Sequence, residues 1–182
     1  MDGEFSRGYA KIDNAHDFKT PCNMAIADST PERKFIRDLC DRQNANAIDA
    51  WIKNAPQRYY AIEYAWKKGE HPKRGEFSPD FFITKNYLIY VVEIKDDSEI
   101  LDPSIENQKK YEYAQTHFER LNQWLTDSDL VTRYQHNWLS PKCYNRFFQF
   151  LRENRAVEFR SELDVALNLA IKRNTVNGQW KE

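Results

Sequence analysis

Two β-rich runs in the middle of the chain carry the clearest pattern of apolar and polar positions. Residues 77–84 (FSPDFFIT) and 87–95 (YLIYVVEIK) are rich in β-branched and aromatic residues. Lys85-Asn86 between them suits a tight turn, because Asn tolerates positive φ. The pattern therefore predicts a hairpin. With a two-residue loop, Asp80 is expected to face Val91 and Ser78 to face Glu93, so that Asp80 and Glu93 are diagonal neighbours.

The hairpin is predicted to have one apolar face and one face with polar chemistry at its end. Side chains alternate between faces, so one set must be covered by other elements: Phe77, Pro79, Phe81, Ile83, Leu88, Tyr90, Val92 and Ile94. The opposite face carries Asp80, Glu93 and Lys95 at one end. Diagonal positions lie roughly 7–8 Å apart, close enough for two carboxylates to reach one magnesium ion. A solvated strand edge or a cross-strand ion pair fits the same short motif equally well.

A first helix is expected to begin at Thr30-Pro31, where a capping residue precedes a proline that suits the first helical position. Phe35, Ile36, Leu39 and Cys40 form its buried stripe. Glu32 falls on the same stripe, which makes it a candidate accessory ligand. The alternative, which we weigh slightly higher, is that an acid in a first turn complements the helix dipole.

A long helix is expected from Asp102-Pro103 onward. Its apolar positions recur at steps of three and four, as in Tyr111, Ala114, Phe118, Leu121 and Leu125. One turn earlier the stripe reaches Asn107, so the first turns should bring Asn107, Lys109 and Lys110 near the strand of Glu93. Core packing for Tyr111 and a solvated face for the lysines are the simpler interpretations.

The other segments complete a mixed α/β arrangement. Strands are expected at about residues 48–52, 58–66 and 131–139, the second of which adds a third strand to the sheet of the hairpin. Residues 69–75 are interpreted as a basic loop. Helices are expected from Ser140-Pro141 and over residues 157–173. Residues 1–28 lack periodicity and are interpreted as a lead-in or linker, which leaves 29–182 as a single domain in the order α-β-β-β-α-β-α-α.

Composition narrows the classes of function. The 182 residues are 41% hydrophobic and 30% charged, without an apolar run of the ~20 residues that span a bilayer, so a cytoplasmic protein is expected. The three cysteines and four histidines lack the spacing of a zinc site or a disulfide framework. The net charge of −1 argues mildly against unaided DNA binding. Local basic pairs are weaker candidates for contacts with phosphate groups, and a solvated surface is the alternative interpretation. They are Lys67, Lys68, Lys73, Arg74, Lys109 and Lys110.

Taken together, these segments resemble the PD-(D/E)xK nuclease superfamily, and more closely the C-terminal endonuclease domain of type III restriction enzyme Res subunits. The resemblance covers roughly residues 30–125 and rests on an ordered set of segments: Glu32 with Phe35, Trp51-Ile-Lys-Asn54, Ile62-Glu-Tyr64, Pro79-Asp80-Phe81 and Val92-Glu93-Ile94-Lys95. It implies a restriction-endonuclease-like core, with an α-β-β-β-α-β mixed central sheet flanked by helices and extra C-terminal helices.

The resemblance also implies roles for individual residues. Asp80, Glu93 and the Ile94 carbonyl would hold Mg²⁺, which Mn²⁺ is expected to replace, and Lys95 would orient the attacking water or stabilise the transition state. Glu32, Asn107 and Lys110 are accessory candidates. The covering helix departs from the RecB-like pattern, because Gln108 and Tyr111 are three residues apart.

The function expected from this resemblance is Mg²⁺-dependent endonucleolytic cleavage of DNA within a restriction or helicase-linked defence system. A Walker-type phosphate loop is absent from the sequence. Translocation is therefore expected from a helicase/ATPase or methyltransferase subunit, or from a missing part of the same polypeptide, and a homodimer is left open. The alternative is a catalytically inactive nuclease-fold module that binds nucleic acid or a partner protein.

Overall fold

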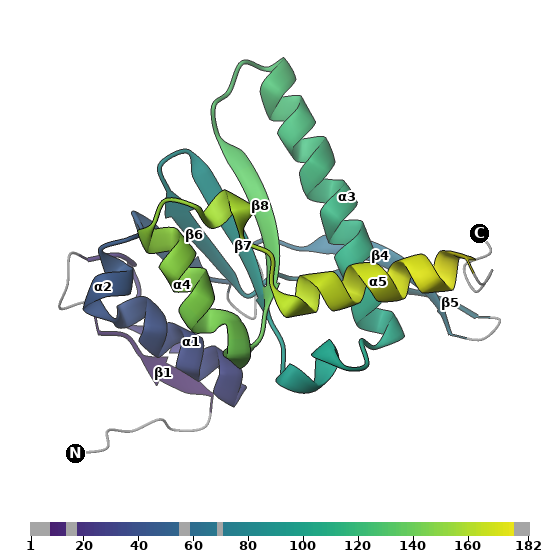
Figure 1. Ribbon diagram of the computed structural model, residues 1–182, viewed down its shortest axis with the longest axis horizontal. Helices are drawn as coiled ribbons and strands as arrows, with labels where there is room; N and C mark the ends of the chain where they lie inside the picture. Colours follow the sequence, from purple (N-terminus) through teal and green to yellow (C-terminus); the bar gives the residue numbers. More distant parts are fainter. Residues whose placement is uncertain (1–7, 14–17, 55–58, 69–70, 177–182) are drawn as a thin grey trace.

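A four-stranded mixed sheet lies at the centre of the fold (Figure 1). The computed structural model describes residues 8–13, 18–54, 59–68 and 71–176. The strand order is β3-β6-β7-β8; the first three strands are antiparallel neighbours, and β8 runs parallel to β7. Their bounds are β3 (Ala50–Lys53), β6 (Phe81–Lys85), β7 (Leu88–Ile94) and β8 (Arg133–Leu139).

Helices cover both faces of this sheet, and each face has its own apolar cluster. One cluster joins the sheet to α1 (Thr30–Cys40) and α4 (Tyr144–Arg152), and α2 (Arg42–Ala45) packs against these two helices. The other joins it to α3 (Ile105–Asp127) and α5 (Glu162–Val176). Figure 1 shows the first group and α3 on opposite sides of β6, β7 and β8. The expected mixed α/β class, with a mixed central sheet flanked by helices, is confirmed.

The hairpin β6–β7 forms with its predicted faces but with a shifted turn. Asn86 has positive φ (54°) as predicted, yet Lys85 still pairs with Leu88, so the loop is Asn86-Tyr87 rather than Lys85-Asn86. Phe82 consequently pairs with Val91 instead of Ile89. The shift moves every pair by two residues, which preserves the parity of the faces.

Strand β6 begins at Phe81, not at residue 77, and Phe77 was placed on the wrong face. Phe77 ends the preceding strand and packs in the cluster under α3, whereas Phe81, Ile83, Tyr90, Val92 and Ile94 pack in the cluster under α1 and α4. Because Phe81 pairs with Val92, one further step along the hairpin places Asp80 opposite Glu93. The predicted facing of Ser78 with Glu93 and of Asp80 with Val91 was therefore wrong.

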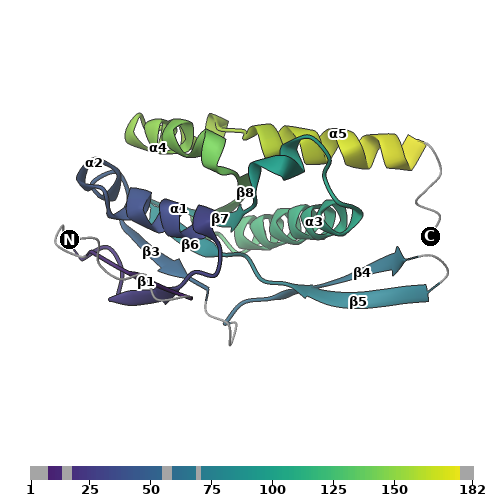
Figure 2. The same ribbon diagram turned by 90° about the horizontal axis from the view of Figure 1, so that it is seen from below.

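A second hairpin, formed by β4 (Ile62–Lys68) and β5 (His71–Phe77), stands apart from the central sheet and runs beside α3 (Figure 2). The prediction that the 58–66 strand joins the main sheet was wrong; β3 takes that place beside β6. The basic loop expected at 69–75 is largely strand, and its residues 69–70 lie outside the described residues. Gly75 allows the pairing, because a Cβ there would lie 2.7 Å from the Tyr64 ring.

The described part of the expected lead-in belongs to the packed fold. β1 (Tyr9–Lys11) and β2 (Met24–Ile26) form a two-stranded sheet. Ala10, Ile12, Ala25 and Ala27 are buried in the same cluster as α1. The described part of residues 1–28 is thus part of the core, and its interpretation as a linker is corrected.

The helix starts differ from the predicted ones by a few residues. Ser29, not Thr30, caps α1, and Ser104 rather than Asp102 caps α3. Ser140-Pro141 opens a 3₁₀ turn, Pro141–Cys143, before α4 begins. Two further 3₁₀ turns span Asp97–Ile100 and Ala156–Glu158. Among the described residues, none of these helices has the length and apolar character needed to cross a bilayer.

Candidate functional site

The predicted acidic and basic side chains meet at one end of the central sheet, where β3 and β7 end and β6 begins. Asp80 immediately precedes β6, Glu93 and Ile94 end β7, and Lys95 follows. Both acids interact electrostatically with each other and with Lys95. The structure therefore brings together the three residues proposed for catalysis, although it assigns them no role.

Pro79 explains why the ladder stops at this point. In the β6–β7 register, the residue opposite Ile94 is Pro79, which has no N–H to donate. The Ile94 N–H instead donates to Asp80 Oδ2 at 2.8 Å. Lys95 N–H bonds to Leu139 on β8, so the polar groups of the preceding residue Ile94 face the β6 side. Among the described residues, no donor reaches the Ile94 carbonyl, which is left facing Asp80.

Glu93 is the most deeply buried acid of the cluster. The residue is 5% exposed; its Oε1 accepts from Lys95 Nζ at 2.6 Å, whereas its Oε2 is buried and has no hydrogen-bond partner in the part of the chain that the structure describes. Burial, and then the negative charge of Asp80, raise the pKa of Glu93 to about 8, with Lys95 opposing the shift. A buried carboxylate oxygen without a partner costs stability, and a bound cation would offset that cost.

Lys95 is held between Glu93 and an aromatic ring. Its Nζ lies 5.4 Å from the centre of the Trp138 ring on β8. Burial opposes its charge, but the carboxylates of Glu93 and Asp80 outweigh burial and raise the pKa of Lys95. Lys95 therefore stays an ammonium group at neutral pH.

A second lysine, Lys53 at the end of β3, bridges two acids. Its Nζ lies 3.0 Å from Asp80 Oδ1 and 2.9 Å from Glu32 Oε2. Burial opposes the charge of Lys53, but both carboxylates outweigh it and raise its pKa. The sequence placed Lys53 only within the Trp51–Asn54 segment and gave it no role, since a lysine at a strand end is an ordinary surface residue until the partner strands are known.

Two of the three accessory candidates, Glu32 and Lys110, interact with residues of this cluster. Glu32 lies in the first turn of α1, as predicted: its N–H donates to Ser29 Oγ, and its Oε1 accepts from Ser29 Oγ at 3.0 Å. Its Oε2 contacts Lys53 Nζ, and its role as an accessory ligand stays a prediction. Lys110 on α3 pairs with Glu106 at 2.8 Å and interacts electrostatically with Glu93. Asn107 is buried one turn before Tyr111, as the stripe predicted.

The weaker phosphate-contact candidates are on the β4–β5 hairpin and on α3. Lys67, Lys68 and Lys73 are on the β4–β5 hairpin, and their side chains lie outside the described residues. Arg74 on the same hairpin is exposed, and Lys109 pairs with Glu112 at 2.6 Å. The structure thus leaves their predicted role open.

The oxygen atoms at the sheet end have the chemistry that Mg²⁺ prefers. Glu93 Oε2 and the Ile94 carbonyl have no donor in the described structure, and Asp80 retains lone pairs on both oxygens. Within the described ranges, no cluster of three or more His, Cys, Asp or Glu side chains is arranged to hold a metal. The fit therefore depends on two carboxylates and one backbone carbonyl, with water completing the coordination.

Comparisons of the chain with protein-family models, with curated proteins and with solved structures found no match.

Proposed function

We propose that this chain is a metal-dependent endonuclease of the PD-(D/E)xK type that hydrolyses DNA phosphodiester bonds. We propose further that it is the nuclease domain of a type III restriction or related helicase-linked defence system. The observation that carries the proposal is the sheet end itself. There, among the described residues, no donor reaches Glu93 Oε2 or the Ile94 carbonyl beside Asp80, and Lys95 Nζ lies 2.6 Å from Glu93 Oε1.

The order of elements supports the proposed superfamily. The elements α1, β3, β6, β7, α3 and β8 follow one another along the chain, with the β4–β5 hairpin inserted between β3 and β6. β3, β6 and β7 are antiparallel neighbours in the sheet, and β8 returns parallel to β7 after α3. This is the α-β-β-β-α-β order that the resemblance implies.

The residues of the cluster suit phosphodiester hydrolysis. Asp80, Glu93 and the Ile94 carbonyl would hold Mg²⁺, which when bound neutralises phosphate charge and lowers the pKa of water. Lys95 has an ammonium group that can donate to a phosphate oxygen or hold the attacking water. The Lys53 bridge holds the Asp80 carboxylate in place between β3 and β7.

Cleavage of supercoiled and linear DNA with Mg²⁺ or Mn²⁺ tests the proposal. Asp80→Asn and Lys95→Ala are expected to reduce the rate at least about a hundredfold, the loss that follows removal of one transition-state contact. Lys34→Ala is the control, because the interactions given for Lys34, with the Pro141 carbonyl, the Tyr144 ring and Asp38, involve none of the proposed catalytic residues. Undiminished cleavage by the Asp80 and Lys95 variants would contradict the assignment, and preferential cleavage of RNA would correct the substrate.

One observation favours the alternative of a catalytically inactive module. Both Asp80 oxygens are already contacted by donors, Lys53 Nζ and the Ile94 N–H, so an ammonium group neutralises part of the site. Calorimetry with Mn²⁺ separates the two proposals. The nuclease is expected to bind Mn²⁺ in a manner lost in Glu93→Gln and strengthened in Lys53→Met, whereas an inactive module shows no binding that depends on these residues.

A further inference from the structure

The outer edge of β8 has a repeating arrangement of backbone groups. β8 is the last strand of the central sheet, so only one of its edges is paired. Arg133 N–H bonds to Tyr87, and the Leu139 carbonyl accepts from Lys95, which fixes the odd-numbered residues as the ones bonded to β7. The N–H and C=O groups of Tyr134, His136 and Trp138 therefore point away from the sheet.

Side chains occupy two of these three positions. The Asn122 amide pairs with Tyr134 through both of its ends: Tyr134 N–H donates to Asn122 Oδ1, and Asn122 Nδ2 donates to the Tyr134 carbonyl, each at 2.7 Å. At the other end, Trp138 N–H donates to Asp164 Oδ1 at 2.9 Å, and Ser161 Oγ donates to the Trp138 carbonyl at 2.5 Å. A planar amide group can thus pair with the N–H and C=O of a single residue on this edge.

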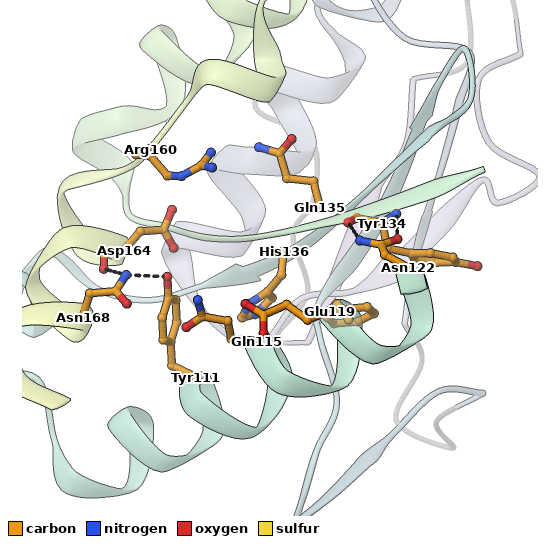
Figure 3. A pocket seen from close by; sticks show the side chains of 11 residues that line it. Tyr111, Gln115, Glu119, Asn122, Tyr134, Gln135, His136, Arg160, Asp164 and Asn168 are labelled. Atoms are coloured by element: carbon orange, nitrogen blue, oxygen red, sulfur yellow. Dashed lines mark hydrogen bonds between the residues drawn. The ribbon is translucent and has the colours of Figure 1, made fainter. Parts of the chain in front are cut away.

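His136 lies between Tyr134 and Trp138, and no side chain among the described residues occupies its outward-facing N–H and C=O. Among the hydrogen bonds of the described residues, none joins the His136 N–H or C=O to a group on this edge. His136 lies in the wall of a pocket of about 210 Å³ between α3, β8 and α5 (Figure 3). Gln115 and Glu119 from α3 and Arg160 and Asn168 from the α5 side surround the same space.

We propose that this pocket binds a single nucleobase through the His136 backbone N–H and C=O. Every base has an adjacent donor and acceptor on its pairing edge, the same pattern that the Asn122 amide offers to Tyr134. The volume suits one base and is below the ~300–1,000 Å³ of pockets for larger ligands. An added β-strand is excluded, because Asn122 and Asp164 already occupy the edge on either side.

The position of the pocket agrees with the proposed nuclease function, on which this inference rests. In the β7–β8 register, Trp138 lies opposite Glu93, and His136 is two residues earlier, roughly 7 Å along the strand. Trp138 contacts both regions, since its ring lies beneath Lys95 and its indole N–H donates to His136 Nε2 at 2.6 Å. A base held at His136 would thus fix a nucleic-acid strand near the acidic cluster.

Titration of the ¹⁵N-labelled protein without metal tests the pocket directly. Thymidine 5′-monophosphate is expected to shift the His136 amide resonance, because thymine offers an N3–H donor between two carbonyl acceptors. The N3-methylated nucleotide lacks the donor and should bind about tenfold more weakly. Abasic deoxyribose 5-phosphate should leave the His136 amide unshifted. Equal binding of all three compounds, which would indicate a phosphate site at Arg160, or binding of none of them, overturns the proposal.

A matched pair of variants on α3 locates the binding. Gln115→Trp fills the pocket, whereas Gln123→Trp alters an exposed glutamine that is two turns away and does not line it. Binding should be lost in the first variant and kept in the second; equal effects of the two would overturn the assignment. Because no metal or cleavage enters this measurement, the base site and the proposed nuclease activity can fail independently.

Discussion

The burial of Glu93 lowers the free energy of unfolding of the domain. Its carboxylate is almost fully buried, and only one of its oxygens has a donor among the residues described. Burial together with Asp80 raises its pKa to about 8. Lys95 offsets part of this cost through the 2.6 Å contact with Oε1. An apolar residue would fit an ordinary strand end better, and the cation that we propose here would offset the cost of Glu93.

Glu93→Gln is expected to change how stability depends on pH. Because the folded-state pKa is raised from 4.5 to about 8, the stability linked to Glu93 is fully present below pH 4.5 and is lost as the pH rises through 8. Relative to the variant, the wild type should lose up to about 1.4 kcal/mol per pH unit in this window. Urea unfolding at a series of pH values measures this, and Mn²⁺ at pH 9 should stabilise the wild type alone. Parallel stability curves would rule out the raised pKa.

At the scale of elements, the alternation of side chains was the part of the site that the sequence could predict. The two-residue shift of the hairpin left Asp80, Glu93 and Lys95 where the faces had placed them, because face parity survives any even shift. That β6 begins only after Pro79 could have been inferred from the missing N–H of this proline. The contact of Lys53 with Asp80 could not be inferred, since it joins two residues that are 27 positions apart in the chain, one at the end of β3 and the other just before β6.

The same limit applies to the β4–β5 hairpin. Pro72 and Gly75 favoured a loop, but Gly75 is needed there because the Tyr64 ring covers it on the paired strand. A glycine in a strand can mark such a close approach, but the sequence does not show which residue approaches it. The sequence also did not show that this hairpin is separate from the central sheet. The pattern of apolar positions allows the 58–66 strand to pair either with the central sheet or with β5.

Asp164→Ala is expected to loosen the join between β8 and α5. Asp164 is buried and accepts from the N–H groups of Trp138 and Ser161, which the variant leaves without partners. The free energy of unfolding should fall by about 2–4 kcal/mol in urea titrations, and the Trp138 amide should exchange faster with solvent. Glu162→Ala is the control: Glu162 is exposed in the first turn of α5 and should cost about 0.3–1 kcal/mol. Equal losses in the two variants would contradict the role given to Asp164.

At the scale of the whole molecule, the two faces of the sheet are buried by different parts of the chain. The predicted helices α1 and α3 lie on opposite faces of the sheet, and the apolar stripe of each helix packs in a different cluster. The β1–β2 sheet completes the α1 side with small residues, and strands of three residues are too short to show a period. A backbone bond from Trp51 N–H to Lys19 at 2.8 Å ties this segment to β3.

Deletion of residues 1–28 should therefore destabilise the entire domain. It removes the buried side chains of Ala10, Ile12, Ala25 and Ala27 from the cluster that contains Phe81 and Val92. Exposing this surface should lower the melting temperature by roughly 10 °C in a chain of this size. Phe18→Ala is the control, because Phe18 is 70% exposed in the same segment and its loss should change the melting temperature little. Removing a segment that contributes to the core must lower the melting temperature. A deletion variant with the same melting temperature as the intact chain would therefore restore the interpretation of residues 1–28 as a lead-in.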